Sequence, residues 1–203
     1  MKGTVFRNTE QGRARLGFAE QVLRSFSFLT KEYDFRVVKT EPTFIRFESS
    51  SVFVNIYHGR ASFELGFEIG RLNDGSGKEE SPHSLRTILE LMGAQEGTGY
   101  TFLQASTQDR VKEFVPKLAS LVKRYAAPAL GGDPSTFEQL MDTDSHISHR
   151  LHQEMRLKDV RKRAAEAWQS RDYALLVDLY ESIFEQLTPA EMKKLEYVKK
   201  NRP

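Results

Sequence analysis

Residues 52–71 read VFVNIYHGRASFELGFEIGR. Apolar side chains stand at every second position on both sides of Gly59-Arg60, which is typical of two strands that each bury one face. We expect a hairpin with a two-residue turn at Gly59-Arg60, because a type II′ turn favours glycine at its first position. The cross-strand pairs that this turn sets are Ile56 with Phe63, Val54 with Leu65, and Val52 with Phe67. All six apolar side chains then lie on one face of the sheet.

Two further strands are predicted before this hairpin. Residues 43–48 alternate in the same way, and residues 35–40 are a weaker candidate for a first strand. A two-residue turn at Ser49-Ser50 would place Phe47 beside Val52, whereas a four-residue loop keeps the same alternation and fits the pattern equally well. The sequence therefore predicts an antiparallel meander of three or four strands.

Apolar residues spaced three and four apart predict helices before and after the meander. The predicted helices cover residues 13–30, 83–92, 107–126, 135–155 with a candidate break at Asp142–Ser145, 172–187, and a last one that starts with Thr188, Pro189 and Glu191. Ser135 and Glu138 form a predicted capping box, and Pro116 predicts a kink or two shorter helices. The fold class is α+β: an N-terminal helix, an antiparallel three- to four-stranded meander, and a mostly helical second half.

The segment Leu130-Gly-Gly-Asp-Pro134 is the clearest interruption between predicted elements. It divides the chain into an α+β domain, residues 1–130, and a helical C-terminal region, residues 131–203, that we expect to pack on it. A single domain that contains both parts is also compatible with the sequence.

The composition excludes several classes of protein. The 203 residues contain no cysteine, which excludes disulfide scaffolds, thiol nucleophiles and cysteine-based zinc sites. No apolar run approaches the roughly 18 residues of a membrane helix, and the first residues lack the apolar segment of a secretory signal, so we expect a cytoplasmic protein. The net charge of +2 is too small to indicate a polyanionic partner.

No pattern in the sequence predicts catalysis, so we expect a protein that is not an enzyme and holds no cofactor. Glu64 and Glu68 share one strand face about 13 Å apart, which exceeds the carboxyl separation typical of glycosidases. His146, His149 and His152 stand three residues apart and fan over about 120° of a helix. We expect them to face solvent and bind no metal.

The side of the sheet opposite the apolar residues carries a different composition, and we call it the second face. Its predicted partner-binding residues are Phe44, Arg46, Phe53, Asn55, Tyr57, Glu64 and Glu68. Aromatic, amide and charged side chains on a rigid sheet are the mixture that protein interfaces favour. Two interpretations stay open: the second face binds a partner, or helices from the second half of the chain cover it.

Three stretches carry a resemblance to a class of known proteins. They are residues 52–71, residues 125–140 (YAAPALGGDPSTFEQL) and residues 172–200 (DYALLVDLYESIFEQLTPAEMKKLEYVKK). Together they resemble small uncharacterised bacterial α+β proteins, many of which are regarded as immunity proteins of contact-dependent or polymorphic toxin systems. The resemblance implies a cytosolic, non-enzymatic protein that binds and neutralises a cognate toxin. The near-neutral charge departs from the acidic character of inhibitors of basic nuclease toxins, so the class of toxin stays open.

Our leading hypothesis is a protein-binding module, of the immunity-protein type, that engages a toxin domain through the second face or the edge of the meander. The alternative is a regulatory or nucleic-acid-associated protein that uses its basic C-terminal helices. Residues 146–203 carry 12 Lys and Arg against 9 Asp and Glu, a net charge of +3. A hydrolase would instead need a deep pocket with convergent polar groups.

Overall fold

The computed structural model describes residues 10–59, 61–72, 80–95 and 103–200. The chain forms two compact units, residues 1–144 and residues 145–203. All the described strands belong to the first unit, whereas the described elements of the second unit are all helices. The architecture is therefore α+β, as the sequence predicts.

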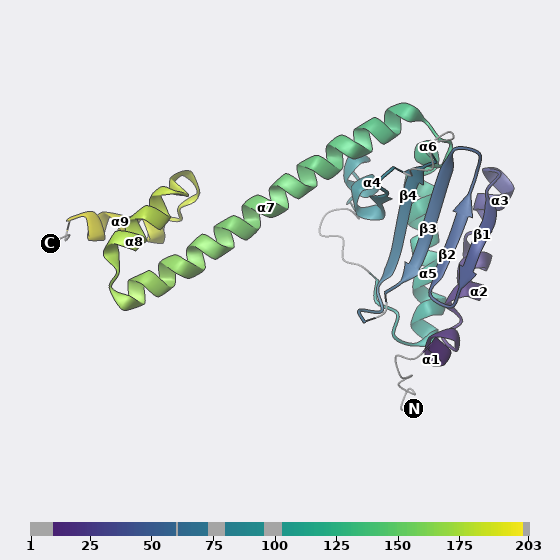
Figure 1. Cartoon of the computed structure of the whole chain (residues 1–203), viewed down its shortest axis with the longest axis horizontal. Helices are drawn as coiled ribbons and strands as arrows, with labels where there is room; N and C mark the ends of the chain where they lie inside the picture. The colour runs from purple at the N-terminus through teal and green to yellow at the C-terminus, as the bar shows by residue number, and fades with distance from the viewer. Residues whose placement is uncertain (1–9, 60, 73–79, 96–102, 201–203) are drawn as a thin grey trace. The chain divides into compact units, whose positions relative to one another are not determined.

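The first unit contains a five-stranded antiparallel sheet whose strands lie in the order of the sequence (Figure 1). The strands are β1 (Arg36–Glu41), β2 (Phe44–Glu48), β3 (Val52–His58), β4 (Leu65–Arg71) and β5 (His83–Ser84). The predicted meander is confirmed, and β5 is an additional strand. Its two residues are too few to show alternation.

The predicted register of the β3–β4 hairpin is wrong by four residues. Ile56 lies opposite Phe67, and Val54 lies opposite Ile69. The connection is wider than two residues because the Gly59 N–H donates to the Glu64 carbonyl at 2.8 Å, which closes the loop further along the chain. An even shift preserves the alternation, so the predicted strand residues still face the core.

Two local features explain how the strands are joined. Phe63, the predicted partner of Ile56, has a φ of +55° and belongs to the β3–β4 loop instead of a strand. Between β2 and β3, Glu48 lies opposite Phe53, so the four-residue loop is confirmed and the two-residue turn is wrong. The Ser49 hydroxyl accepts the Val52 N–H at 3.1 Å and stabilises this loop.

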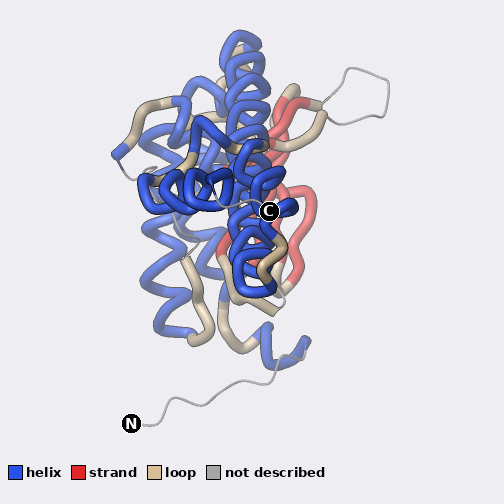
Figure 2. The backbone as a smooth tube through the Cα atoms, turned by 90° about the vertical axis from the view of Figure 1, so that its left-hand side faces the viewer, coloured by secondary structure: helices blue, strands red, loops and turns tan. Residues whose placement is uncertain are grey.

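The core of the first unit lies between one face of the sheet and the helices α2 (Phe18–Ser25), α3 (Ser27–Glu32) and α5 (Gln108–Tyr125). Figure 1 shows α5 running behind the strands, and Figure 2, which colours strands red, shows the same two layers after a quarter turn. The largest fully buried side chains of this core include Phe18, Phe26, Phe47, Phe67, Ile45, Ile56, Leu65 and Ile69.

The N-terminal helix is divided into three parts, α1 (Glu10–Ala14), α2 and α3. The division between α1 and α2 falls at Gly17, whose φ of +69° is a left-handed conformation that ends helices. After the sheet, Ser84 caps α4 (Leu85–Leu91) by accepting the Thr87 N–H. α5 is one helix through Pro116, so the alternative of two shorter helices is wrong.

A four-residue helix, α6 (Ala127–Leu130), leads to α7 (Pro134–Ser170), a helix of 37 residues. Asp133 caps the start of α7, since its Oδ2 accepts the Thr136 N–H at 3.0 Å. Ser135 donates its hydroxyl to the same oxygen, so the predicted Ser135 cap is wrong. The Thr136 hydroxyl also donates to this oxygen, at 2.6 Å, and this bond first and the Ser135 bond second lower the pKa of Asp133. α7 also continues through residues 142–145, where a break was predicted.

The second unit packs the later part of α7 against α8 (Tyr173–Glu181) and α9 (Pro189–Lys200), with a short turn of 3₁₀ helix, η2 (Phe184–Gln186), between them. α8 ends six residues before the predicted end. The predicted start of α9 is confirmed, because the Thr188 N–H donates to Glu191 Oε2 at 2.7 Å and the Glu191 N–H returns to Thr188 Oγ1 at 3.3 Å. Trp168 packs against Tyr173 and Tyr197, with ring centroids 6.0 and 6.1 Å away.

Candidate functional site

The second face carries six of its seven predicted residues on strands β2, β3 and β4. One cross-strand row through its centre consists of Lys39, Arg46, Asn55, Glu68 and Ser84. A neighbouring row pairs Phe44 with Tyr57. The seventh residue, Glu64, lies outside β4 in an isolated bridge with Gln104.

Phe53 lies at the bottom of a stack on this face. Its ring covers Gly70, where an added Cβ would fall 2.6 Å from the ring. The Arg46 guanidinium carbon lies 4.3 Å from the centre of the same ring. Arg46 Nε in turn donates to Glu48 Oε1 at 2.7 Å. Phe53 is only 1% exposed, so it supports the surface while Arg46 and Glu48 form its upper layer.

Two more aromatic side chains lie beside this stack. The Tyr57 ring lies flat on Gly66, and an added Cβ there would overlap the ring. The Phe44 ring has Lys39 Nζ 5.2 Å from its centre. Both rings are half-buried. The second face therefore presents aromatic surface that glycines on β4 and neighbouring lysine and arginine side chains hold in place.

Replacing Gly70 with Ala should destabilise the first unit by about 1–3 kcal/mol, because the new methyl group meets a ring that Arg46 prevents from moving away. Urea denaturation followed by circular dichroism measures this loss. Gly131→Ala is the matched control, since a Cβ at Gly131 would meet only carbonyl oxygens at 3.4 Å or more. Equal stability of the two variants would contradict the stacked arrangement.

Asn55 occupies the centre of the polar row and is 9% exposed. Its Oδ1 accepts no hydrogen bond from any described residue. A buried amide oxygen without a donor costs roughly 1–3 kcal/mol. The row therefore contains one polar atom that the described part of the fold leaves unsatisfied.

A second buried polar group joins the start of the chain to the β3–β4 loop. Arg13 is 4% exposed, and its Nη2 donates to the carbonyls of His58 and Gly59 at 2.7 and 2.6 Å. Its guanidinium carbon lies 4.4 Å from the centre of the Phe63 ring. No pattern in the sequence predicts this contact, because Arg13 and His58 are 45 residues apart.

His58 is 2% exposed and stacks on Phe18 at 5.3 Å between ring centroids. Neither ring nitrogen makes a hydrogen bond of good geometry within the described residues. Burial lowers the pKa of His58 from 6.5 to about 4, the Arg13 charge adds to this effect, and the backbone of Ala105 and Phe63 opposes it only in part. His58 is therefore a neutral, structural residue near pH 7.

A third polar group combines an imidazole with a carboxylate. His83 Nδ1 lies 2.6 Å from Asp144 Oδ2, and Thr87 Oγ1 donates to Asp144 Oδ1 at 2.5 Å. An imidazole oriented by a carboxylate is the base of a hydrolytic triad. Within the described residues, however, no hydroxyl bonds to the His83 ring, and Ser84 contacts Thr87 instead. This group ties β5 and α4 to α7.

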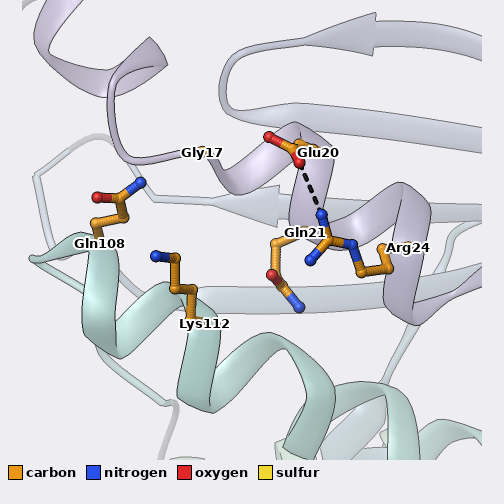
Figure 3. A pocket seen from close by; sticks show the side chains of 6 residues that line it. All are labelled: Gly17, Glu20, Gln21, Arg24, Gln108 and Lys112. Atoms are coloured by element: carbon orange, nitrogen blue, oxygen red, sulfur yellow. Dashed lines mark hydrogen bonds and ion pairs between the residues drawn. The ribbon is translucent and has the colours of Figure 1, made fainter.

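A cleft of about 290 Å³ lies between α2 and α5. Figure 3 shows the side chains that line it. Its lining residues are Gly17, Glu20, Gln21, Arg24, Gln108 and Lys112. Arg24 and Glu20 pair with each other at 2.8 Å across one helical turn. The lining is polar and solvent-exposed, and it lacks the apolar walls that ligand pockets normally have.

The three histidines considered as metal ligands and the basic residues considered for nucleic-acid binding lie in the second unit. His146, His149 and His152 are exposed on α7, and the described residues hold no group of three His, Cys, Asp or Glu that could bind a metal. Arg161 Nε donates to Glu191 at 2.9 Å. Arg156 donates to the Ser182 carbonyl at 3.4 Å. These two arginines of the basic C-terminal helices thus make contacts within the second unit.

Within the described part of the chain, none of the helices has both the length and the apolar character to cross a membrane. Comparisons of this chain with protein-family models, with curated proteins and with solved structures give no match.

Proposed function

We propose that this chain is a non-enzymatic protein-binding module that holds its partner on the second face of the sheet. The observation that carries this proposal is the stack in which Arg46 lies over Phe53 and Phe53 lies over Gly70. Arginine and aromatic side chains held rigidly in place lose little entropy on binding, and they dominate the energetics of protein interfaces.

The half-buried residues Phe44, Tyr57 and Glu68 would make the direct contacts with the partner. Glu68 lies opposite Asn55, and Phe44 lies opposite Tyr57 in the neighbouring row. The side-chain oxygen of Asn55 lacks a donor within the described residues. A partner that drew this amide outward could supply a hydrogen bond and remove a cost that the isolated chain carries. The partner we propose is a toxin domain, which the bound chain neutralises as an immunity protein does.

The test is to purify the tagged chain from its native host, identify a stoichiometric protein partner, and measure its affinity for purified variants. Phe44→Ala should raise Kd about tenfold or more, as expected for an aromatic residue at the centre of an interface. The matched control is Phe114→Ala on α5. Phe114 is also half-buried, and Lys117 Nζ lies 5.1 Å from the centre of its ring. The corresponding distance from Lys39 Nζ to the Phe44 ring is 5.2 Å.

A loss of affinity in Phe44→Ala alone supports the second face as the binding surface. Equal affinities of both variants would contradict it. A partner with toxin activity that this chain suppresses would support the immunity role, and a partner without toxic activity would contradict that role only. Recovery of nucleic acid in place of protein would favour the basic helices.

A further inference from the structure

β1 forms an edge of the sheet, and its six residues, RVVKTE, are all exposed. It pairs on one side with β2, and no other described strand pairs with it. Val37 and Val38 are 41% and 42% exposed, which is unusual for valines in a strand. Exposed edges of this length are sites where another strand can add to a sheet.

A bulge at Val38 sets which way the side chains of β1 face. The register shifts between Val37 and Lys39, so that Arg36 lies opposite Glu48 and Glu41 lies opposite Phe44. Glu48 and Phe44 both lie on the second face. Arg36 and Glu41 therefore lie on this face too, although a regular strand would place residues five apart on opposite faces.

This arrangement makes β1 complementary to itself. We propose that two copies of the chain pair through β1 as antiparallel neighbours, with Arg36 of each copy opposite Glu41 of the other. The same register places Val37 opposite Thr40, and both of these residues face the core side, since their partners on β2 are Phe47 and Ile45. Both of these pairs thus lie on a common face, as an antiparallel pair of strands requires, and the bulges of the two copies, at Val38 and Lys39, meet at the centre of the register.

Charge complementarity favours a second copy as the occupant of this edge. Two Arg–Glu pairs form per dimer, related by the two-fold axis of an isologous contact. Among the described residues, the Arg36 side chain makes no hydrogen bond or ion pair, whereas Glu41 Oε1 lies 2.8 Å from Lys39 Nζ on its own strand. The assembly stops at two copies because each copy uses its β1 edge in the contact. The two five-stranded sheets then form one sheet of ten strands.

The test is the oligomeric state of the full chain, measured by sedimentation equilibrium. The wild type should give a dimer of twice 23.3 kDa. Arg36→Glu or Glu41→Arg alone places like charges opposite each other twice per dimer and should raise its Kd about tenfold or more. The double variant Arg36→Glu with Glu41→Arg restores opposite charges and should restore the dimer.

Lys117→Glu on α5 is the control, because it reverses the same charge on a helix away from β1 and should leave Kd unchanged. Circular dichroism of each variant shows that the fold is retained. A wild-type chain that stays monomeric at all concentrations would overturn the proposal. A dimer that withstands both single reversals, or that the double variant fails to restore, would overturn it as well. This test needs no binding partner, so it is independent of the proposed function.

Discussion

Lowering the pH from 6.5 to about 4 should remove about 3 kcal/mol of stability from the first unit through His58 alone. The imidazole has an ordinary pKa of 6.5 in the unfolded chain and a pKa of about 4 in the fold. In this window the unfolded chain binds a proton that the folded chain excludes. The stabilisation is therefore complete above pH 6.5 and is lost as the pH falls toward 4.

The measurement is the free energy of unfolding in urea at several pH values, for the wild type and for His58→Leu. Leucine keeps an apolar contact with Phe18 and cannot titrate, so the variant should lose about 3 kcal/mol less than the wild type between pH 6.5 and 4. Carboxylates titrate in both chains, and the difference between the two profiles removes their contribution. Parallel profiles for the wild type and His58→Leu would refute the assignment.

Phe53→Ala should destabilise the first unit by about 3–5 kcal/mol, which is the usual cost of truncating a buried phenylalanine. The substitution leaves a gap beneath Arg46 and beside Gly70, and the guanidinium loses the ring on which it lies. The free energy of unfolding in urea measures this loss.

Phe44→Ala, on the same face but half-buried, should cost only about 1 kcal/mol. The comparison of these two variants explains why the binding test uses Phe44→Ala. A loss of the complex in Phe53→Ala would reflect unfolding of the first unit. A small loss of unfolding free energy in Phe53→Ala would mean that the Phe53 ring lies at the surface. Phe53 would then be one of the residues in direct contact with the partner.

The strands could be predicted because their residues alternate strongly, and the second face followed from the same alternation. The set of residues on the second face does not depend on the register, since a shift by four residues leaves each side chain on the same side of the sheet. The opposing glycines do depend on it: Tyr57 lies opposite Gly66 and Phe53 opposite Gly70. The predicted register placed Gly66 opposite Phe53, so it assigned the wrong glycine to Phe53 and missed the packing of the Tyr57 ring on Gly66.

The buried Arg13 shows a different limit of sequence patterns. The predicted register of the β3–β4 hairpin was wrong because Phe63 continues the apolar alternation of the strand. In the structure, the Phe63 ring packs on the Arg13 guanidinium instead. Nothing near Arg13 in the sequence marks it as buried, because its hydrogen-bond acceptors are main-chain carbonyls at the end of β3. A carbonyl is present in every residue and leaves no trace in composition or spacing. Contacts of this kind become visible only once the strands are assembled.

Trp168, packed between Tyr173 and Tyr197, is the single tryptophan of the chain. Its fluorescence therefore reports only on the surroundings of residues 145–203, while far-ultraviolet circular dichroism sums the signal of both units. One unlabelled sample is enough to follow both signals through the same denaturation. Coincident curves would show that the two units unfold in one cooperative transition, and separate curves would assign a free energy of unfolding to each.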